Sequence, residues 1–435
     1  MFFLSPEQPA LQIFRGDVLL YSKEFKDKLN EQYQYFKSLN LNLDMSRGKP
    51  CPEQLALSNS MLDLVNSQSN FKINEEIDCR NYGLLDGITE LKVLFAKMLD
   101  VLPTDVLIGG NSSLQMMFDT ISCFMTHKIV DGHPWLMQGN IKFLCPVPGY
   151  DRHFSILQYF GVEQIAVPMC ETGPDMDMVE NLVSKDEKIK GIWCIPKYSN
   201  PQGVTYSAIT VQRFANLKPA AKDFRIFWDN AYAVHDLTDQ PERLLSIMDE
   251  CRKASNEDLP ILFCSTSKIT FPGAGIAALA ASESNLKILK ENYFYKTICF
   301  DKINQLRHLR FLKNYEGILS HMEKHKKILK PKFEAVEEIL NTEFEGEELI
   351  SWTKPKGGYF ISVALPDGCA KRVVFLCREA GVKLTSAGAT FPLNCDPHDA
   401  NIRLAPSYPP VCELLLAMKL FCVCVKLVFV ENALR

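Results

Sequence analysis

The chain has 435 residues, of which 47% are hydrophobic and 23% charged, and its formal net charge is -4. This composition excludes a disordered chain and fits a globular protein that is long enough for two domains of unequal size. Because charges of both signs are spread along the chain, a nucleic acid is not an expected partner.

The cysteines and the two ends of the chain indicate a cytoplasmic protein. Fifteen cysteines are scattered, mostly inside apolar runs, and their odd number favours reduced thiols over disulfides or a zinc site. The apolar stretch at the N-terminus is too short for a signal peptide, and an acidic residue follows it too closely. Lys419 and Lys426 interrupt the apolar run 414–430 before it reaches the roughly 20 residues that span a bilayer. We therefore predict an amphipathic closing helix and no membrane anchor.

The first part of the chain predicts a helix and two shaped loops. Apolar residues recur at helical spacing over 18–40. The segment 41–52 is extended and closed by prolines, and Gly48 within it allows close approach of the backbone to another group. Tyr82 follows in a glycine-flanked turn, where its hydroxyl is a candidate donor to an anion. A half-buried loop tyrosine is the alternative.

Residues 106–115 read as a short strand, a pair of glycines and the start of a helix. Helix N-termini present unpaired N–H groups and the positive end of the helix dipole, so Gly110, Asn111, Ser112 and Ser113 predict an anion cradle. The spacing is neither that of a P-loop nor Gly-x-Gly-x-x-Gly, which favours a single phosphate over a nucleotide. Capping of the helix by Asn111 or Ser112, without a ligand, is the alternative.

Three further apolar strands end in residues suited to a planar ring. The run 141–147 leads to Tyr150, whose aromatic face can lie against such a ring. The run 191–195 leads to Asn200, which is followed by a proline and a glycine. The run 224–228 ends in Asp229, a carboxylate that is costly to bury without a cation, and Tyr232 follows three residues later.

Residues 261–275 join an apolar strand to a hydroxyl-rich turn and a proline–glycine break. Lys268 lies in that turn, at the edge of a partly apolar crevice. Burial disfavours the ammonium form, so this lysine can act as a neutral amine and condense with an aldehyde. Ser265 and Ser267 beside it are candidate anion donors. A solvated surface lysine is the alternative.

Strands that alternate with helical segments predict a doubly wound α/β sheet, whose strand ends converge on one crevice. From about residue 301 the pattern changes to long charged helices and short strands, which predicts a smaller α+β domain. We expect a segment 1–60 that joins the small domain, a large domain over 61–305, and the small domain itself over 306–435. Arg403, inside an apolar run, needs an acidic partner or a ligand carboxylate.

Together these candidates form the set that pyridoxal 5'-phosphate (PLP) requires. The cofactor needs a lysine for its imine, a cradle for its phosphate, an aromatic clamp on its ring and an acid on its pyridine nitrogen. The acid keeps that nitrogen protonated, so that the ring absorbs carbanion charge. The chain supplies these groups, in the same order, as Lys268, the 110–113 cradle with Ser265 and Ser267, Tyr150, and Asp229.

The chain resembles the class I, fold-type I, PLP-dependent aminotransferases. The motifs Tyr-x4-Gly, Asn-Pro-x-Gly, Asp-x-x-Tyr, Ser-x-Ser-Lys and Asn-x-Arg occur in the family's order between about residues 45 and 410. The segments 47–55 and 401–409 resemble more narrowly a bacterial aspartate aminotransferase subgroup, sometimes called type Ic. The resemblance implies a mostly parallel sheet in the large domain. It also implies ping-pong transfer of an amino group from L-aspartate, or a related amino acid, to 2-oxoglutarate.

The resemblance also implies a role for each cofactor position. Lys268 would hold PLP as a Schiff base and then move the proton of the substrate α-carbon. Asp229 would pair with the pyridine nitrogen, and Tyr150 would stack on the ring. Tyr232 and Asn200 would bind the phenolic oxygen. The phosphate would be held by Asn111, Ser112, Ser113, Ser265 and Ser267.

For the substrate and the assembly, the resemblance implies two further features. Arg403 would bind the substrate α-carboxylate, with Asn200 and the N–H of Gly48 nearby. Tyr82 would reach the phosphate of a neighbouring subunit, which implies a homodimer with active sites at its interface.

Two positions depart from the family pattern. Ile276 stands where many relatives have a phosphate-binding arginine, eight residues after the lysine. The arginine that binds a distal carboxylate has no match, and Arg47 and Lys49 are candidates only by their proximity to Gly48. A PLP-dependent lyase or decarboxylase, or an aminotransferase for aromatic or other amino acids, is the alternative on this fold. Arg403 favours aminotransfer, because it holds the α-carboxylate in the ring plane and protects it from loss.

Overall fold

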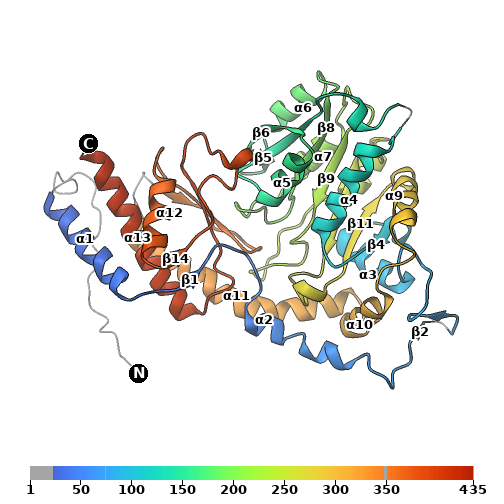
Figure 1. The fold of residues 1–435 in the computed structure, drawn as a ribbon, viewed down its shortest axis with the longest axis horizontal. Coiled ribbons are helices and arrows are strands. Elements are labelled where there is room, and N and C mark those ends of the chain that lie inside the picture. The colour runs from blue at the N-terminus through green and yellow to red at the C-terminus, as the bar shows by residue number, and fades with distance from the viewer. Residues whose placement is uncertain (1–22, 74, 131, 347–349, 435) are drawn as a thin grey trace.

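The computed structural model describes residues 23–434 except 74, 131 and 347–349, and its largest element is an eight-stranded sheet (Figure 1). From edge to edge the strands are β4 (Val106–Ile108), β11 (Ala277–Ala281), β10 (Pro260–Ser265), β9 (Arg225–Asp229), β8 (Ile189–Cys194), β5 (Lys142–Val147), β6 (Glu163–Cys170) and β7 (Gly173–Pro174). The five strands from β10 to β6 are parallel, whereas β11 and β7 run antiparallel to their neighbours. The predicted mostly parallel α/β sheet is confirmed.

Helices cover both faces of this sheet (Figure 1). One apolar layer includes α3 (Thr89–Leu99), α6 (Met176–Val183), α7 (Ala208–Ala215) and α8 (Ile247–Lys253), and the other includes α4 (Ser113–Thr126), α5 (Asp151–Tyr159) and α9 (Glu283–Lys296). Along β10, Leu262 and Cys264 face the first layer while Ile261 and Phe263 face the second. A strand buried on both faces is apolar throughout, which is why these segments read as continuous hydrophobic runs.

A smaller sheet lies beside the large one and consists of β12 (Ser351–Trp352), β13 (Ile361–Ala364) and β15 (Asn401–Leu404). It shares an apolar core with α11 (Tyr315–Phe344), α12 (Ala370–Glu379) and α13 (Val411–Ala433). The described N-terminal elements join this core, because α1 (Lys23–Ser38) packs on α13 and β1 (Leu43–Asp44) pairs with β14 (Val382–Lys383) (Figure 1). The limits 1–60, 61–305 and 306–435 stay a prediction, and residues 1–22 lie outside the described residues.

Two local expectations are corrected by the structure. The sequence did not indicate β6, because a proline and several exposed positions interrupt its apolar pattern. The closing helix α13 is amphipathic only as far as the exposed Lys419, since residues 420–430 are buried on all sides by α1, α11 and α12. Lys426 is therefore 2% exposed, although its spacing from Lys419 suggested a shared solvent face.

Three structural facts bear on the compartment and on metals. Among residues 23–434, as far as they are described, no helix is both long and apolar enough to cross a membrane. The fifteen cysteines are free, and eleven of them are buried. No cluster of three or more metal-ligating side chains occurs in the described part of the chain. The cytoplasmic location stays a prediction.

The buried ion pair between Lys426 and Glu343 of α11 generates a test of stability. Glu343→Ala removes a carboxylate from an ammonium that is enclosed by helices. We expect a loss of about 1.5–3 kcal/mol in the free energy of unfolding, the range for hydrogen bonds to charged groups. Urea denaturation measures it. Lys426→Met, which removes the charge and keeps apolar volume, is expected to cost less, and the reverse order would contradict this account.

Candidate active site

The predicted site residues follow the ends of strands that run in the same direction. Because β4 and β10 are each antiparallel to β11, they are parallel to one another, so their carboxyl ends meet those of β9, β8 and β5 at one edge of the sheet. At this edge lie Ser112 and Ser113 after β4, Tyr150 after β5, Asn200 after β8, Asp229 and Tyr232 at the end of β9, and Lys268 after β10.

Lys268 is half-buried and lies among aromatic rings. Its Nζ is 4.9 Å from the ring centroid of Tyr232 and 5.9 Å from that of Tyr359. Burial lowers the pKa of the Lys268 amine below its usual value of 10.5, and the negative charge of Asp229 opposes this shift. The structure therefore brings the predicted amine and the predicted acid into electrostatic contact, in surroundings that favour a neutral amine.

Asp229 is 2% exposed, and its two carboxylate oxygens differ. Oδ2 lies 3.0 Å from Nε2 of His153, whose ring stacks on Trp193 at 4.2 Å. Oδ1 is buried and has no hydrogen-bond partner among the described residues. A buried carboxylate oxygen without a partner is costly, so this atom is suited to a cationic donor from a bound molecule. Sequence reasoning missed His153, because nothing in its local pattern points to a partner 76 positions away.

Two tyrosines near this pair are held in the protonated form. Tyr150 is the N-cap residue of α5. The centroid of its ring lies 5.0 Å from that of the His153 ring, and the two rings are in a T-shaped arrangement. Burial raises the pKa of the Tyr150 hydroxyl to about 12 and also raises that of Tyr232, which is 2% exposed. Both hydroxyls therefore remain hydrogen-bond donors at neutral pH.

The predicted anion cradle is continuous with the lysine turn. Ser112 is the N-cap of the 14-residue helix α4, but its side chain makes no capping hydrogen bond. The Ser112 side chain therefore does not cap the helix, contrary to the alternative considered above. The first N–H groups of α4 stay available to a ligand. Ser265 Oγ donates to Ser267 Oγ at 3.0 Å, and Ser267 Oγ donates to the carbonyl oxygen of Asn111 at 3.4 Å.

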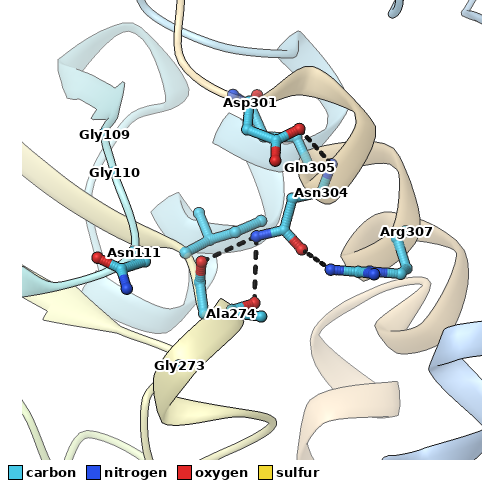
Figure 2. A pocket seen from close by; sticks show the side chains of 11 residues that line it. Gly109, Gly110, Asn111, Gly273, Ala274, Asp301, Asn304, Gln305 and Arg307 are labelled. Atoms are coloured by element: carbon cyan, nitrogen blue, oxygen red, sulfur yellow. Dashed lines mark hydrogen bonds between the residues drawn. The ribbon is translucent and has the colours of Figure 1, made fainter.

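A cavity of about 210 Å³ opens beside this cradle (Figure 2). Ile276, the position noted above as a departure from the family pattern, is among the residues that line it and also belongs to the apolar core. Arg307 of α10 (Lys302–Leu312) reaches the same cavity and donates to Asn304 Oδ1 at 2.5 Å. Asn304 Nδ2 in turn donates to the carbonyls of Ala274 and Gly275 (Figure 2). A guanidinium thus lies near the cradle, on a helix that the sequence predicted after residue 301 but did not connect with the site.

Arg403 lies on β15 and is 2% exposed. Its Nη1 donates to Asn200 Oδ1 at 3.2 Å and to Asp151 Oδ1 at 3.1 Å, and its guanidinium lies 4.8 Å from the ring centroid of Phe360. A Cβ at Gly48 would lie 2.4 Å from Cζ of that ring, so the Gly48 backbone packs directly on Phe360. The structure thus joins the predicted substrate residues Gly48, Asn200 and Arg403.

The chain resembles known proteins over nearly its whole length. The family model described as aspartate amino-transferase matches residues 21–435. The chain belongs to this family. The aspartate aminotransferase of Corynebacterium glutamicum is 44% identical over 425 residues, which is 97% of each chain. The crystal structure of an aspartate transaminase from the same organism has a TM-score of 0.93 and 42% identity, and covers 98% of this chain and 100% of that one.

The chain is a transaminase, and its fold is that of the fold-type I PLP-transferases. The same fold is seen in an α-aminoadipate aminotransferase of Thermus thermophilus, with a TM-score of 0.73 at 20% identity over 92% of this chain and 95% of that one. That crystal structure contains N-(5'-phosphopyridoxyl)-L-leucine.

Tyr82 is a predicted site residue of this transaminase that lies at the surface of the single chain. Its ring is 77% exposed, in the loop between β3 (Ile77–Asp78) and α3. The carbonyls of Asn81 and Gly83 on either side accept hydrogen bonds from Lys302, which is 2% exposed. The loop is therefore fixed while the tyrosine ring projects from the surface.

Burial and Asp229 act on the Lys268 pKa in opposite directions, which leads to a prediction for the transaminase with no cofactor or substrate bound. Asp229→Asn removes the charge that holds the Lys268 pKa up, so that pKa is expected to fall further below 10.5. The pH dependence of Lys268 acylation, read by mass spectrometry of the modified peptide, measures the shift. The exposed Lys49 serves as an internal reference. An unchanged or higher Lys268 pKa in the variant would refute the coupling.

Proposed function

We propose that this transaminase uses PLP to move the amino group of L-aspartate, or a related acidic amino acid, to 2-oxoglutarate in a ping-pong cycle. Two observations carry the proposal: Asp229 Oδ1 is buried and has no hydrogen-bond partner among the described residues, and the charge of Asp229 acts on the nearby Lys268, whose pKa is lowered by burial. An acid that faces a ring nitrogen and a lysine that is readily neutral are the two groups that PLP chemistry requires. The 44% identity with an aspartate aminotransferase supports the choice of substrate.

The residues around this pair fit the cofactor. Lys268 would carry it covalently, and Asp229, braced by His153, would hold the pyridine nitrogen in its protonated form. Tyr150 would lie against the ring, and Asn200 with Tyr232 would donate to the phenolic oxygen. The N–H groups at Ser112 and Ser113, with Asn111, Ser265 and Ser267, would hold the phosphate at the N-terminus of α4.

When it is bound, PLP supplies an aldehyde that condenses with amines and a ring that accepts the electrons of a carbanion. The protein supplies position and proton transfer. Once it is free of the cofactor, Lys268 Nζ would take the proton from the substrate α-carbon as a general base and deliver it, as a general acid, to C4′ of the cofactor. Burial lowers the pKa of this amine and so favours its base form. Arg403 fixes the α-carboxylate, so that the bond to the α-hydrogen is the one that breaks.

The exposed Tyr82 supports the further proposal of a homodimer. Its ring lies on a fixed loop at the surface of the single chain, as expected for a side chain that enters a neighbouring subunit's site. A two-fold dimer would use the same contact twice. The assignment to the type Ic subgroup rests on the segments 47–55 and 401–409 and belongs to the same proposal.

The half-reaction with a single amino acid tests the function. Addition of L-aspartate to the PLP-loaded protein is expected to convert the cofactor to its amino form and release one equivalent of the 2-oxo acid, and 2-oxoglutarate is expected to reverse the change. The cofactor absorbance band and the keto acid are measured together. Ammonia or carbon dioxide released without consumption of a keto acid acceptor would identify a lyase or a decarboxylase and overturn the proposal.

Replacement of the lysine gives the second test. Lys268→Ala is expected to abolish turnover and the covalent cofactor band, because no other amine replaces its Nζ, while circular dichroism remains that of the native fold. PLP is expected to bind the variant only reversibly, as dialysis would show. Residual transamination above about one part in 10³ would count against Lys268 as the base, because general acid–base catalysis contributes roughly 10²–10⁴-fold.

A further inference from the structure

The loop 266–276, which carries Lys268, is held by the side chains of one helix. Asn304 and His308 lie one turn apart on α10, and both side chains contact this loop. Asn304 Nδ2 donates to the carbonyl oxygen of Gly275 at 2.9 Å, near the end of the loop (Figure 2). His308, which is fully buried, contacts the first half of the loop. The helix therefore holds the loop at both ends.

The hydrogen-bond partners of His308 determine which of its ring nitrogens carries the proton. Nδ1 lies 2.9 Å from the carbonyl oxygen of Asn304, which can only accept, so Nδ1 is the donor. Burial lowers the pKa of the imidazole to about 4, so the ring is neutral at neutral pH. Nε2 is therefore an acceptor, and the Thr270 hydroxyl donates to it at 2.9 Å.

A second threonine extends this contact to the other side of Lys268. Thr266 Oγ1 lies 3.3 Å from His308 Nε2 and 3.1 Å from Thr270 Oγ1. It also accepts a hydrogen bond from the backbone N–H of Ile276 at 2.9 Å. Both threonines are buried, so their hydroxyl groups depend on the protein for partners. One imidazole thus holds the side chains that come two positions before and two positions after the lysine.

The residue directly after Lys268 is held from a second helix. The carbonyl oxygen of Ile269 accepts a hydrogen bond from Nε2 of His321, on α11, at 2.9 Å. The backbone around Lys268 is therefore fixed by contacts at residues 266, 269 and 270. Because Nζ stands at the end of a long and flexible side chain, its position relative to a reacting atom depends on where this backbone is fixed.

On the basis of the function proposed above, we propose that His308 is a positioning residue for Lys268. Through the hydroxyl groups of Thr266 and Thr270 it fixes the turn so that Nζ reaches the hydrogen on the substrate α-carbon. A displacement of about 1 Å at a reacting group lowers a rate by up to ~10²-fold. His308 therefore affects the proton transfer that Lys268 performs, and not the affinity for the substrate, which other residues bind.

Three variants of the PLP-loaded enzyme and one control test the proposal. His308→Phe keeps an aromatic ring but removes both nitrogen atoms, His308→Gln restores an acceptor as an amide oxygen, and Thr270→Val removes one hydroxyl group. Thr120→Val is the matched control, because Thr120 is as deeply buried as Thr270 and its hydroxyl donates to a carbonyl within α4, outside the loop.

The half-reaction with excess L-aspartate is followed in a single turnover by the cofactor absorbance band. For His308→Phe we expect the rate constant to fall about 10- to 100-fold at full amplitude, since a misplaced base slows the proton transfer in every molecule. Thr270→Val is expected to show a smaller fall, because Thr266 Oγ1 remains near Nε2. His308→Gln is expected to lie between His308→Phe and the wild type.

The same measurement contains its control. The apparent affinity for L-aspartate, taken from the concentration dependence of the rate constant, is expected to remain that of the wild type in each variant, and Thr120→Val is expected to keep the wild-type rate constant. A loss of amplitude with an unchanged rate constant in His308→Phe would assign His308 a merely structural role and overturn the inference.

Hydrogen exchange in the cofactor-free protein supplies a readout that does not depend on turnover. The N–H of Ile276, which donates to Thr266 Oγ1, is expected to exchange about 10-fold faster in His308→Phe, the effect of losing roughly one hydrogen bond. Mass spectrometry of a peptide that spans 266–276 measures the exchange, and Thr120→Val is expected to leave it unchanged. Wild-type exchange in His308→Phe would show that the histidine does not hold the loop, and would overturn the inference.

The failure of this inference is distinguishable from a failure of the proposed function. If the wild type converts aspartate but His308→Phe keeps the wild-type rate constant, His308 does not position Lys268. If no amino acid changes the cofactor band of the wild type, the proposed function itself fails and the inference fails with it.

Discussion

The buried carboxylate of Asp229 is the constraint on which the proposed site depends. It ends β9 in the centre of the large sheet, next to β10, which leads into the turn with Lys268. Burial lowers the pKa of the Lys268 amine and the negative charge of Asp229 opposes that shift, while among the described residues His153 bonds to only one of the two carboxylate oxygens. The buried Asp229 Oδ1, which has no partner among the described residues, and the buried amine of Lys268 are therefore suited to bind a cationic ring.

The second sheet completes the site from the other side. Arg403 is fixed by Asn200 and Asp151 from the large-sheet part and by Phe360 and Thr385 from its own part. These contacts make the position of the arginine depend on how the two parts meet. A movement between them would change the hydrogen bonds of Arg403.

The predicted anion cradle depends on a local sequence pattern, whereas the side chains around it come from distant parts of the chain. Glycines, small hydroxyl residues and a helix start predicted the cradle at 110–113, because the N-terminus of a helix is defined by its own backbone. The cation near it was not predictable, since Arg307 comes from α10, almost 200 positions away, and reaches the cavity through Asn304. The same holds for His153, which meets Asp229 only because α5 packs against the sheet edge.

The sequence by itself determined the α/β class and the strand ends that carry Lys268, Asp229, Asn200 and Tyr150. Local sequence patterns are sufficient to predict strands that are buried on both faces, and also the turns and first residues of helices. Only the tertiary structure decided the pairing of Asp229 with His153, the burial of Lys426 and the contact of His308 with the turn that carries Lys268. These contacts join elements that are distant along the chain, and no local pattern records which distant side chain will fill a given space.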